Sequence, residues 1–477
     1  MTAPIECFIL IACPHEFTTE ARWVLGMWTA RYNVAARFVR TNADIPQGAP
    51  AIVYGDRVEI PGPMVHIPHI PVDSTHLSPE TTCWVDHHGD PILDLTGTGN
   101  PTISRHNGDI SLGFDIIASI AEIILGEQSM QERVRDTHGR VPMAATPVGR
   151  LGLVGTPVVD HWLGVLSDGV SAVTNRQVQR RGLWGGAPFA VCITHDIDRV
   201  TRGWVDAVRR GRSFVSSGRI REGIRTAGAA LRVLRTGHDL YWNLREVLEL
   251  DVSYGVTPTF LLLPSRSHDL DARFDIREGR WREIASDIRD AGGEIGLHAG
   301  YESFRDLDAL RREQRELEDA VGEVISTVRQ HYLRFDPCVT PGVQSNAGLL
   351  TDTTAGFAET PGFRHGTAFP YPWFDRGGKQ VLPIMEIPLV LMDRTLDVYL
   401  GLGPERAWDH IETILDRAAD TGGCFSILWH NHVLVEACFP GWSELYEQVL
   451  VWARGRGARF TTCTNASQSI LDASGAV

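Results

Sequence analysis

The stretch Phe189-Ala-Val-Cys-Ile-Thr-His-Asp-Ile-Asp-Arg199 predicts a buried strand that ends in a site. Its first five residues are mostly apolar and follow a Gly/Pro turn at 185–188, a pattern typical of a short buried strand. Asp196 and Asp198 are two residues apart, so on an extended strand their carboxylates point the same way and repel each other. A bound cation relieves this repulsion, and we therefore expect a metal ion at the carboxyl end of this strand.

The chain after Phe189 alternates short apolar strands with amphipathic helices. Strands that alternate with helices form a parallel sheet, and seven of them favour an incomplete or distorted (β/α)7 barrel. In such a barrel the loops after the strands carry the chemistry, which places Asp196 and Asp198 at the carboxyl rim. The expected strands are 189–193, 257–263, 294–297, 328–333, 385–392, 425–429 and 459–463, and the expected helices are 243–253, 280–291, 304–325, 404–419 and 442–454.

A smaller α/β domain is expected to precede the barrel, because 477 residues exceed one ordinary core. We place this domain at residues 1–185 and the barrel domain at 186–477. Strands are expected at 5–12 and 51–54 and helices at 20–29 and 114–125, whereas 61–71 contains too many prolines for either. The stretch Arg135-Asp-Thr-His-Gly-Arg140 lacks a carboxylate or Cys partner at ligand spacing, so we expect a surface turn there.

Composition excludes several classes of protein. The formal net charge of -14 argues against a protein that binds nucleic acid through a broad basic face. The eight cysteines form no Cys-x-x-Cys pair, which favours reduced thiols. Glu6 precedes the short apolar run 8–12, and no Lys or Arg comes before Arg22, so a signal peptide is not expected. No apolar run approaches the length of a membrane span, and we expect a cytoplasmic location.

The segment from Arg199 to Arg235 is strongly basic. It contains ten arginines but only two acids, Asp206 and Glu222. One interpretation is a basic amphipathic lid that meets an anionic substrate or the surface of an anionic membrane. The other is a pair of solvated helices, and the sequence leaves both open.

Polar residues also follow the later strands. The strand at 294–297 ends at His298, the strand at 328–333 contains Arg329 and His331, and the strand at 425–429 is followed by His430 and His432. Because successive strand ends meet at one rim of a barrel, we expect these side chains to converge on Asp196 and Asp198.

In these residues the chain resembles the polysaccharide deacetylase family, the carbohydrate esterases built on the NodB homology domain, over about residues 186–470. The resemblance is carried by Thr194-His-Asp-Ile-Asp198, Leu297-His298-Ala-Gly-Tyr-Glu302, Arg329-Gln-His-Tyr332 and Leu428-Trp-His430, which are similar to the first, second, third and fifth motifs of the family. Further similarity to a branch with an uncharacterised N-terminal domain comes from Asp136-Thr-His-Gly-Arg140, Pro157-Val-Val-Asp160 and Gly362-Phe-Arg-His-Gly-Thr367.

The resemblance implies a role for each matching residue. Asp196 would be the general base, with Arg329 orienting it, and His430 would be the general acid. Asp198 and His298 would bind a divalent metal, with Zn²⁺ as the first choice. The physical chemistry agrees, because a metal ion acidifies water and polarises a carbonyl, and a histidine can protonate an amine that leaves.

The chain departs from the family pattern at the third metal ligand. The second histidine of the family would fall at Glu302, whose carboxylate can bind a metal or can remain solvated beside a helix that Ser303 caps. His195 and His331 are the alternatives. Arg334 offers a second alignment for the arginine motif, although Arg329 fits the spacing better.

We therefore expect a metal-dependent hydrolase that removes an N-acetyl group, or secondarily an O-acetyl group, from a sugar or glycan precursor. A phosphate-bearing precursor is one option, with peripheral contact to an anionic membrane through residues 199–235. Arg364, His365 and Trp429 are the expected substrate contacts, and Trp373 is a further candidate for stacking on a sugar. The alternatives are a hydrolase of a non-sugar linear or cyclic amide on the same fold, and a catalytically inactive module that binds glycan.

Overall fold

The computed structural model describes residues 3–70, 83–87, 90–94, 102–126 and 134–474. The first sheet lies in the N-terminal region, has the strand order β2-β1-β3-β4-β8-β7 and is parallel except for β7. Its strands are β1 (Ile5–Ala12), β2 (Val34–Val39), β3 (Ala51–Gly55), β4 (Met64–Ile67), β7 (Ile103–His106) and β8 (Asp109–Leu112). A separate hairpin joins β5 (Cys83–His87) and β6 (Asp90–Asp94). The smaller α/β region expected before the barrel is present.

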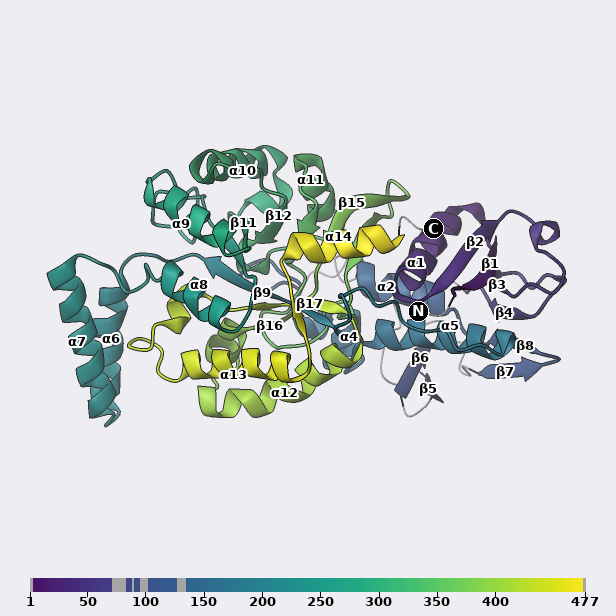
Figure 1. Cartoon of the computed structure of the whole chain (residues 1–477), viewed down its shortest axis with the longest axis horizontal. Coiled ribbons are helices and arrows are strands. Elements are labelled where there is room, and N and C mark those ends of the chain that lie inside the picture. Colours follow the sequence, from purple (N-terminus) through teal and green to yellow (C-terminus); the bar gives the residue numbers. More distant parts are fainter. Residues whose placement is uncertain (1–2, 71–82, 88–89, 95–101, 127–133, 475–477) are drawn as a thin grey trace.

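The second sheet curls around β9 (Ala190–Ile197), in the middle of the long view in Figure 1. Its order is β14-β15-β13-β12-β11-β10-β9-β17-β16, with β18 added beside β9, and every pairing except β14–β15 is parallel. The strands are β10 (Thr259–Leu262), β11 (Glu294–Ala299), β12 (Thr327–Gln330), β13 (Thr351–Asp352), β14 (Tyr371–Asp375), β15 (Gln380–Glu386), β16 (Leu389–Met392), β17 (Cys424–Leu428) and β18 (Arg459–Phe460).

The connection between β15 and β16 nearly closes this sheet into a barrel. The amide of Ile387 donates to Asp352 of β13 at 2.8 Å, and the carbonyl of Pro388 accepts from Ser426 of β17 at 2.8 Å. The expected strand 385–392 is therefore wrong as a single element. Pro388 has no amide hydrogen for a ladder, so the strand divides there and changes partner. The distorted barrel predicted from the sequence is confirmed.

Three further expectations need correction. The strand expected at 328–333 stops at Gln330, because Tyr332 and Leu333 adopt left-handed backbone with φ of 58° and 53°. The strand expected at 459–463 is only β18, since a helix begins at Cys463. The proline-rich stretch 61–71 does contain a strand, β4, whose residues lie between Pro63 and Pro68 and so keep their amide hydrogens.

Helices cover both sheets (Figure 1). In the N-terminal region these are α1 (His15–Arg31), α2 (Ile116–Leu125), α4 (Pro147–Arg150) and α5 (Val158–Thr174). Around the barrel they are α8 (Leu244–Ser253), α9 (Arg280–Asp290), α10 (Leu307–Val321), α11 (Thr340–Ala347), α12 (Pro404–Asp420), α13 (Trp442–Gly455) and α14 (Cys463–Ser474). Within the described ranges, no helix is both long enough and apolar enough to cross a bilayer.

The arginine-rich segment forms two helices, α6 (Gly203–Ser216) and α7 (Ile220–Thr236). They pack against each other as a hairpin and project from the end of the molecule opposite the N-terminal sheet (Figure 1). Contact with the body includes Thr226, which donates to the carbonyl of Ala437 at 2.9 Å.

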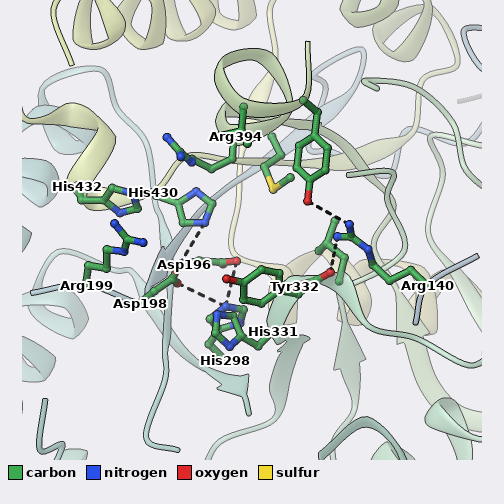
Figure 2. Close-up of a pocket in the computed structure, with 14 residues that line it drawn as sticks. Arg140, Asp196, Asp198, Arg199, His298, His331, Tyr332, Arg394, His430 and His432 are labelled. Carbon is green, nitrogen blue, oxygen red and sulfur yellow. Dashed lines mark hydrogen bonds and ion pairs between the residues drawn. The ribbon is translucent and has the colours of Figure 1, made fainter. Parts of the chain in front are cut away.

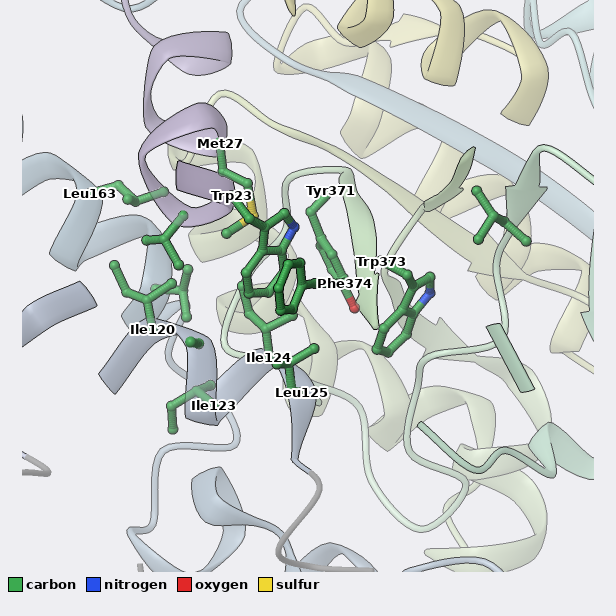
Figure 3. Packing of buried hydrophobic residues seen from close by; sticks show 14 of the residues in the cluster. Trp23, Met27, Ile120, Ile123, Ile124, Leu125, Leu163, Tyr371, Trp373 and Phe374 are labelled. Carbon is green, nitrogen blue, oxygen red and sulfur yellow. The ribbon is translucent and has the colours of Figure 1, made fainter. Parts of the chain in front are cut away.

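The N-terminal helices pack directly on the barrel. Trp23 of α1 stacks on Phe374 of β14 with ring centroids 5.4 Å apart and donates its indole N–H to the carbonyl of Pro372 at 2.8 Å. Figure 3 shows these rings beside Ile124 of α2. One cluster of buried apolar residues therefore crosses the expected boundary at residue 185. The division into two domains stays a prediction.

Arg31 of α1 and Asp160 of α5 form a buried ion pair in this contact region. Asp160 also accepts from the Thr367 hydroxyl at 2.7 Å and from the Ala368 amide at 2.9 Å. Removing one member of such a pair leaves an uncompensated buried charge, so we expect Asp160→Ala to lower the free energy of unfolding by about 3–5 kcal/mol.

Urea denaturation measures this change through the midpoint and slope of the unfolding curve. Asp56→Ala is the control, because Asp56 lies in the N-terminal region with an exposed side chain and should change stability by less than about 0.5 kcal/mol. An Asp160→Ala protein as stable as this control would show that the pair does not hold the two regions together.

Candidate functional site

The end of β9 sorts its polar residues onto two faces. Alternate strand residues point to opposite sides, so Thr194 and Asp196 face the barrel interior while His195 faces outward. His195 is fully buried, with Nδ1 2.7 Å from the carbonyl of Trp429 and Nε2 2.9 Å from a carboxylate oxygen of Asp251. Both ring nitrogens already have partners. The structure therefore does not support His195 as the third metal ligand.

Asp198, His298 and His331 form a group that can hold a metal ion. One ligand atom from each lies within 4.8 Å of the other two. His298 donates from Nδ1 to the carbonyl of Arg329 at 3.0 Å, which leaves Nε2 facing Asp196 at 3.5 Å and Asp198 at 3.6 Å. A partner on one ring nitrogen fixes the orientation of the other, as is usual for metal-binding histidines.

His331 reaches this group through the unusual backbone after β12. The left-handed residues Tyr332 and Leu333 turn the chain at the carboxyl rim. Nδ1 of His331 lies 3.2 Å from Asp271, and this carboxylate also accepts the Tyr301 amide at 2.8 Å. Asp271 thus fixes the His331 ring and leaves Nε2 available to a ligand.

The donor set fits a divalent cation. Oδ1 of Asp198 is buried and has no hydrogen-bond partner in the part of the chain that the structure describes, as expected of an atom that binds a metal ion. Burial, opposed in part by Asp196, lowers the pKa of His298 and keeps the imidazole neutral. Two imidazoles and a carboxylate are a common donor set of catalytic zinc.

Glu302 lies outside this group. Its side chain is 62% exposed and pairs with Arg334 at 3.1 Å. The expectation that Glu302 is the third ligand is therefore replaced by His331, the alternative from the next strand. Arg334 pairs with Glu302 and donates to the carbonyl of Tyr301. Arg334 is therefore not the arginine beside Asp196.

Arg329 holds Asp196. The guanidinium is fully buried and donates to Asp196 and to the Thr194 hydroxyl, each at 2.8 Å, and to the carbonyl of Thr353 at 2.8 Å. Burial raises the pKa of Asp196, but the charges of Arg329, His298 and His430 outweigh it and the pKa is lowered overall. Asp196 is therefore a carboxylate at neutral pH, aimed by a fixed arginine.

His430 lies across the pocket with a carboxylate partner that the sequence analysis missed. Nδ1 of His430 is 2.7 Å from Oδ1 of Asp393, and the His430 amide donates to the other oxygen of Asp393 at 2.9 Å. Burial disfavours the imidazolium, yet Asp393 and Asp198 outweigh it and raise the pKa of His430 to about 9. Its Nε2, 3.6 Å from Asp198, can donate a proton into the pocket.

One pocket of about 190 Å³ is lined by Asp196, Asp198, His298, His331 and His430 (Figure 2). Its wall includes Tyr332, Tyr399 and Arg140. Arg140 comes from the N-terminal region and donates to Asp136 at 2.6 Å, to the carbonyl of Tyr332 at 2.8 Å and to the Tyr399 hydroxyl at 3.0 Å. The expected turn at 136–140 forms, but it is part of the pocket and does not lie only at the surface.

The expected substrate contacts do not line this pocket. Trp429 is fully buried against Trp442 and Tyr446. Arg364 and His365 line a separate small cavity. These expectations are corrected: residue type suggested contact with substrate, but Trp429 is held in the core, and half-buried Arg364 and buried His365 face a different cavity.

Trp373, the other expected stacking residue, is also fully buried, against Phe335 and Tyr371. The interpretation of the arginine-rich helices as a lid over the substrate also needs correction. Of the ten arginines between residues 199 and 235, the described pocket wall contains Arg199 and none of the others.

Comparisons with known proteins return structures but no sequence matches. No family model matches the chain, and no curated protein matches it. A protein from Mycobacterium smegmatis named as a polysaccharide deacetylase is 19% identical, with a TM-score of 0.40, over 60% of this chain and 91% of that one. A second protein so named, from Pseudomonas aeruginosa PAO1, is 13% identical, with a TM-score of 0.40, over 60% and 91%. The Puue allantoinase is 13% identical, with a TM-score of 0.40, over 61% and 96%.

Proposed function

We propose that the protein is a metal-dependent hydrolase that removes an N-acetyl group from a sugar or glycan precursor. One observation carries the proposal. An ionised carboxylate, Asp196, and a histidine with a raised pKa, His430, face the same Asp198–His298–His331 group in one pocket. A base and an acid whose pKa values are driven apart around one ligand position are typical of a hydrolytic site.

Asp198, His298 and His331 would hold the cation. A divalent ion bound there supplies Lewis acidity toward an amide carbonyl and toward water. Zn²⁺ is our choice, because imidazole and carboxylate donors suit it and because it needs no redox partner.

Asp196 would accept a proton from the attacking water. Arg329 supports this role in two ways: its charge keeps the carboxylate ionised, and its fixed hydrogen bonds stop the carboxylate from turning away. The second oxygen of Asp196 faces His298 and the cation group. This orientation supports the proposed role of Asp196 as the base.

His430 would protonate the departing nitrogen as the C–N bond breaks, so that acetate and a free amine are formed. Amines are poor leaving groups unless they are protonated, and Asp393 stabilises the imidazolium that can donate this proton. This argument favours N-acetyl over O-acetyl substrates, because an alcohol depends less than an amine on protonation by a general acid in order to leave.

Acetate release from N-acetylated sugars, with and without a chelator, tests the proposal. We expect activity to disappear on chelation and to return with added Zn²⁺, and metal analysis to find about one tightly held divalent ion per chain. An O-acetylated sugar and allantoin, a cyclic ureide, are the comparison substrates. Activity that is indifferent to the chelator would rule out this mechanism, and a folded protein that binds neither metal nor acetylated sugar would exclude both the enzyme and a binding module.

A further inference from the structure

One side of the pocket carries cationic side chains that the proposed reaction does not use. Arg199 and Arg394 both line the pocket, on the side of His430 and His432 and across from Arg140 (Figure 2). The hydrogen bonds of Arg140 go to protein atoms, so it acts as a strut. Arg199 and Arg394 have more N–H donors than their carboxylate neighbours accept.

The carboxylates near Arg199 and Arg394 do not saturate them. Arg199 is 3.6 Å from Asp206, and its side chain is 58% exposed. Arg394 donates from one terminal nitrogen to Asp397 at 2.6 Å. A guanidinium has five N–H donors in a planar fork that matches carboxylate and phosphate oxygens. Both arginines can therefore bind an additional anion.

His432, in the same part of the pocket wall, has a buried polar atom without a hydrogen-bond partner among the described residues. The residue is 3% exposed, and its Nδ1 has no hydrogen-bond partner among the described residues. It lies in the positive field of His430, Arg199 and Arg394. A buried polar atom without a partner is costly, so its presence in a pocket wall points to a ligand atom that the protein itself does not supply.

We propose that Arg199, Arg394 and His432 form a subsite for an anionic group of the substrate. The substrate class is then an N-acetylated sugar that carries a phosphate or a carboxylate, held with its acetamido group toward Asp196. This inference rests on the proposed function for the identity of the sugar, but the anion site itself does not depend on turnover.

Calorimetric binding of inorganic phosphate to the full chain tests the subsite directly. Charge-assisted hydrogen bonds are strong, so we expect Arg199→Gln and Arg394→Gln each to weaken binding about tenfold. Arg394→Lys should keep much of the affinity, because the charge stays. Arg202→Gln is the matched control: this exposed arginine is close in sequence but is not part of the described pocket wall, and its loss should change nothing.

The same titration after treatment with a chelator separates the anion subsite from the metal group. Phosphate binding that persists and still depends on the arginines supports the subsite, even if no sugar is ever deacetylated. Binding that vanishes with the chelator and ignores both arginine variants assigns the anion to the cation group and overturns the proposal.

Three sugars then distinguish the sources of the anion. N-acetylglucosamine 1-phosphate, N-acetylmuramate and neutral N-acetylglucosamine present phosphate, carboxylate or no charge. We expect one of the anionic sugars to bind about tenfold more tightly than the neutral one, with the difference lost in the Arg394→Gln protein. Equal binding of all three would contradict the inference.

The α6–α7 hairpin supports a second, independent inference. Its helices pack through small residues such as Gly211, which lies against Thr226. Seven large apolar side chains are nevertheless exposed on it: Trp204 41%, Val208 43%, Val215 55%, Ile220 61%, Ile224 68%, Leu231 48% and Leu234 68%. Their spacing along each helix places them in one stripe per helix.

On α7 the side chains of Ile220, Ile224, Leu231 and Leu234 fall within about 80° of one another at about 100° per residue. On α6 those of Trp204, Val208 and Val215 fall within about 40°, and Val215 also packs against Gly223 of α7, so this stripe borders the contact between the helices. We call the surface that carries these side chains the apolar face of the hairpin. The flanking surface is cationic, with exposed Arg209, Arg212, Arg221, Arg232 and Arg235, whereas Arg225 pairs with Glu436 at 2.8 Å.

We infer that this face of the hairpin docks on an anionic lipid bilayer. The charge argument selects lipid over a general apolar partner, since the whole chain has a net charge of -14 and the arginines flank the apolar stripe on this hairpin. Apolar side chains enter the headgroup boundary, and arginines beside them pair with lipid phosphates.

Sedimentation with vesicles of phosphatidylcholine, with or without phosphatidylglycerol, tests the docking. We expect binding only with phosphatidylglycerol, weakened by salt, and reduced more than tenfold by Ile224→Ser with Leu234→Ser. Val451→Ser is the control, an equally apolar side chain that is 55% exposed on α13. Equal binding by the double variant and the control, or a change of oligomeric state in the double variant alone, would overturn the inference.

Discussion

Asp196→Asn is expected to lower the rate of acetate release by about a thousandfold or more, while the protein still binds its divalent cation. Asparagine has nearly the same shape and can still accept a hydrogen bond from Arg329, but it cannot take a proton from water. Asp196 is not a member of the Asp198–His298–His331 group, so its charge is needed for the reaction more than for holding the metal.

Two variants serve as comparisons for this prediction. Asp198→Asn should lose both activity and tightly bound metal, because it removes a ligand oxygen. Arg329→Lys should keep metal and lose part of the activity, since a lysine keeps the positive charge but cannot reproduce the bidentate-capable fork. Rates are compared with metal content and with a melting curve for each protein. Asp196→Asn with more than about a tenth of the original rate would exclude Asp196 as the base.

The convergence of the central residues could be predicted because it follows from topology. Asp196, His298 and Arg329 each stand at the carboxyl end of a short apolar strand, and parallel strands bring such ends to one rim. The register of the sheet then pairs His298 directly with Arg329 across β11 and β12. Residues paired in this way have side chains on the same face of the sheet. A pattern with a period of two residues is enough to say which side chains face the interior.

The sequence leaves the third position of the metal group open among Glu302, His195 and His331, because it depends on backbone conformation. The family resemblance favours Glu302, four residues after His298. The left-handed backbone at Tyr332 and Leu333 brings in His331 instead. Neither residue is a glycine, so no sequence signal marks the turn.

Asp393 was missed for a different reason. An acid directly after the apolar run Leu389–Met392 is the same signal that identified Asp196. The sequence favours one strand over 385–392, and the break at Pro388 has no clear signal within it, so the end of the run does not stand out as a rim position. Asp393 lies 2.7 Å from His430, and Arg329 lies 2.8 Å from Asp196, so the two pairs are about equally close.

Contacts between distant segments had no sequence signal. Arg140 and the carbonyl that it reaches on Tyr332 are 192 positions apart. Trp429 shows the opposite error: an aromatic residue beside a catalytic motif suggested a sugar platform, but the side chain is fully buried. Residue type indicates what a side chain can do, and only packing decides where it can do it.

His430→Ala is expected to reduce the hydrolysis of N-acetyl sugars by about a hundredfold to ten-thousandfold, the usual contribution of a general acid. The structural reason is that the carboxylate neighbours of His430, a histidine of the pocket wall, raise its pKa to about 9. The acid must be protonated to act, so activity should fall as the pH rises through that pKa.

Asp393→Asn tests the cause of the raised pKa. Removing the negative charge beside the ring lowers the pKa of His430, and the alkaline limb of the rate profile should move to lower pH by about one to three units. The rate of turnover between about pH 6 and pH 10 measures this shift. Asp409→Asn is the control, an exposed acid on α12 that should leave the limb where it is. An unmoved limb in Asp393→Asn would mean that Asp393 does not set the pKa of the acid.

The chemistry of the leaving group decides between a true proton donor and a residue that only shapes the pocket. An acetyl ester of p-nitrophenol has a leaving group that departs without protonation, whereas a sugar amine does not. If His430 donates the proton, His430→Ala should lose most of its effect on the activated ester and keep it on the amide. If His430 only packs against its neighbours, both substrates should slow equally, because a distorted pocket penalises each alike. The decrease in rate that His430→Ala causes on the amide, divided by the decrease on the ester, therefore measures the contribution of proton transfer.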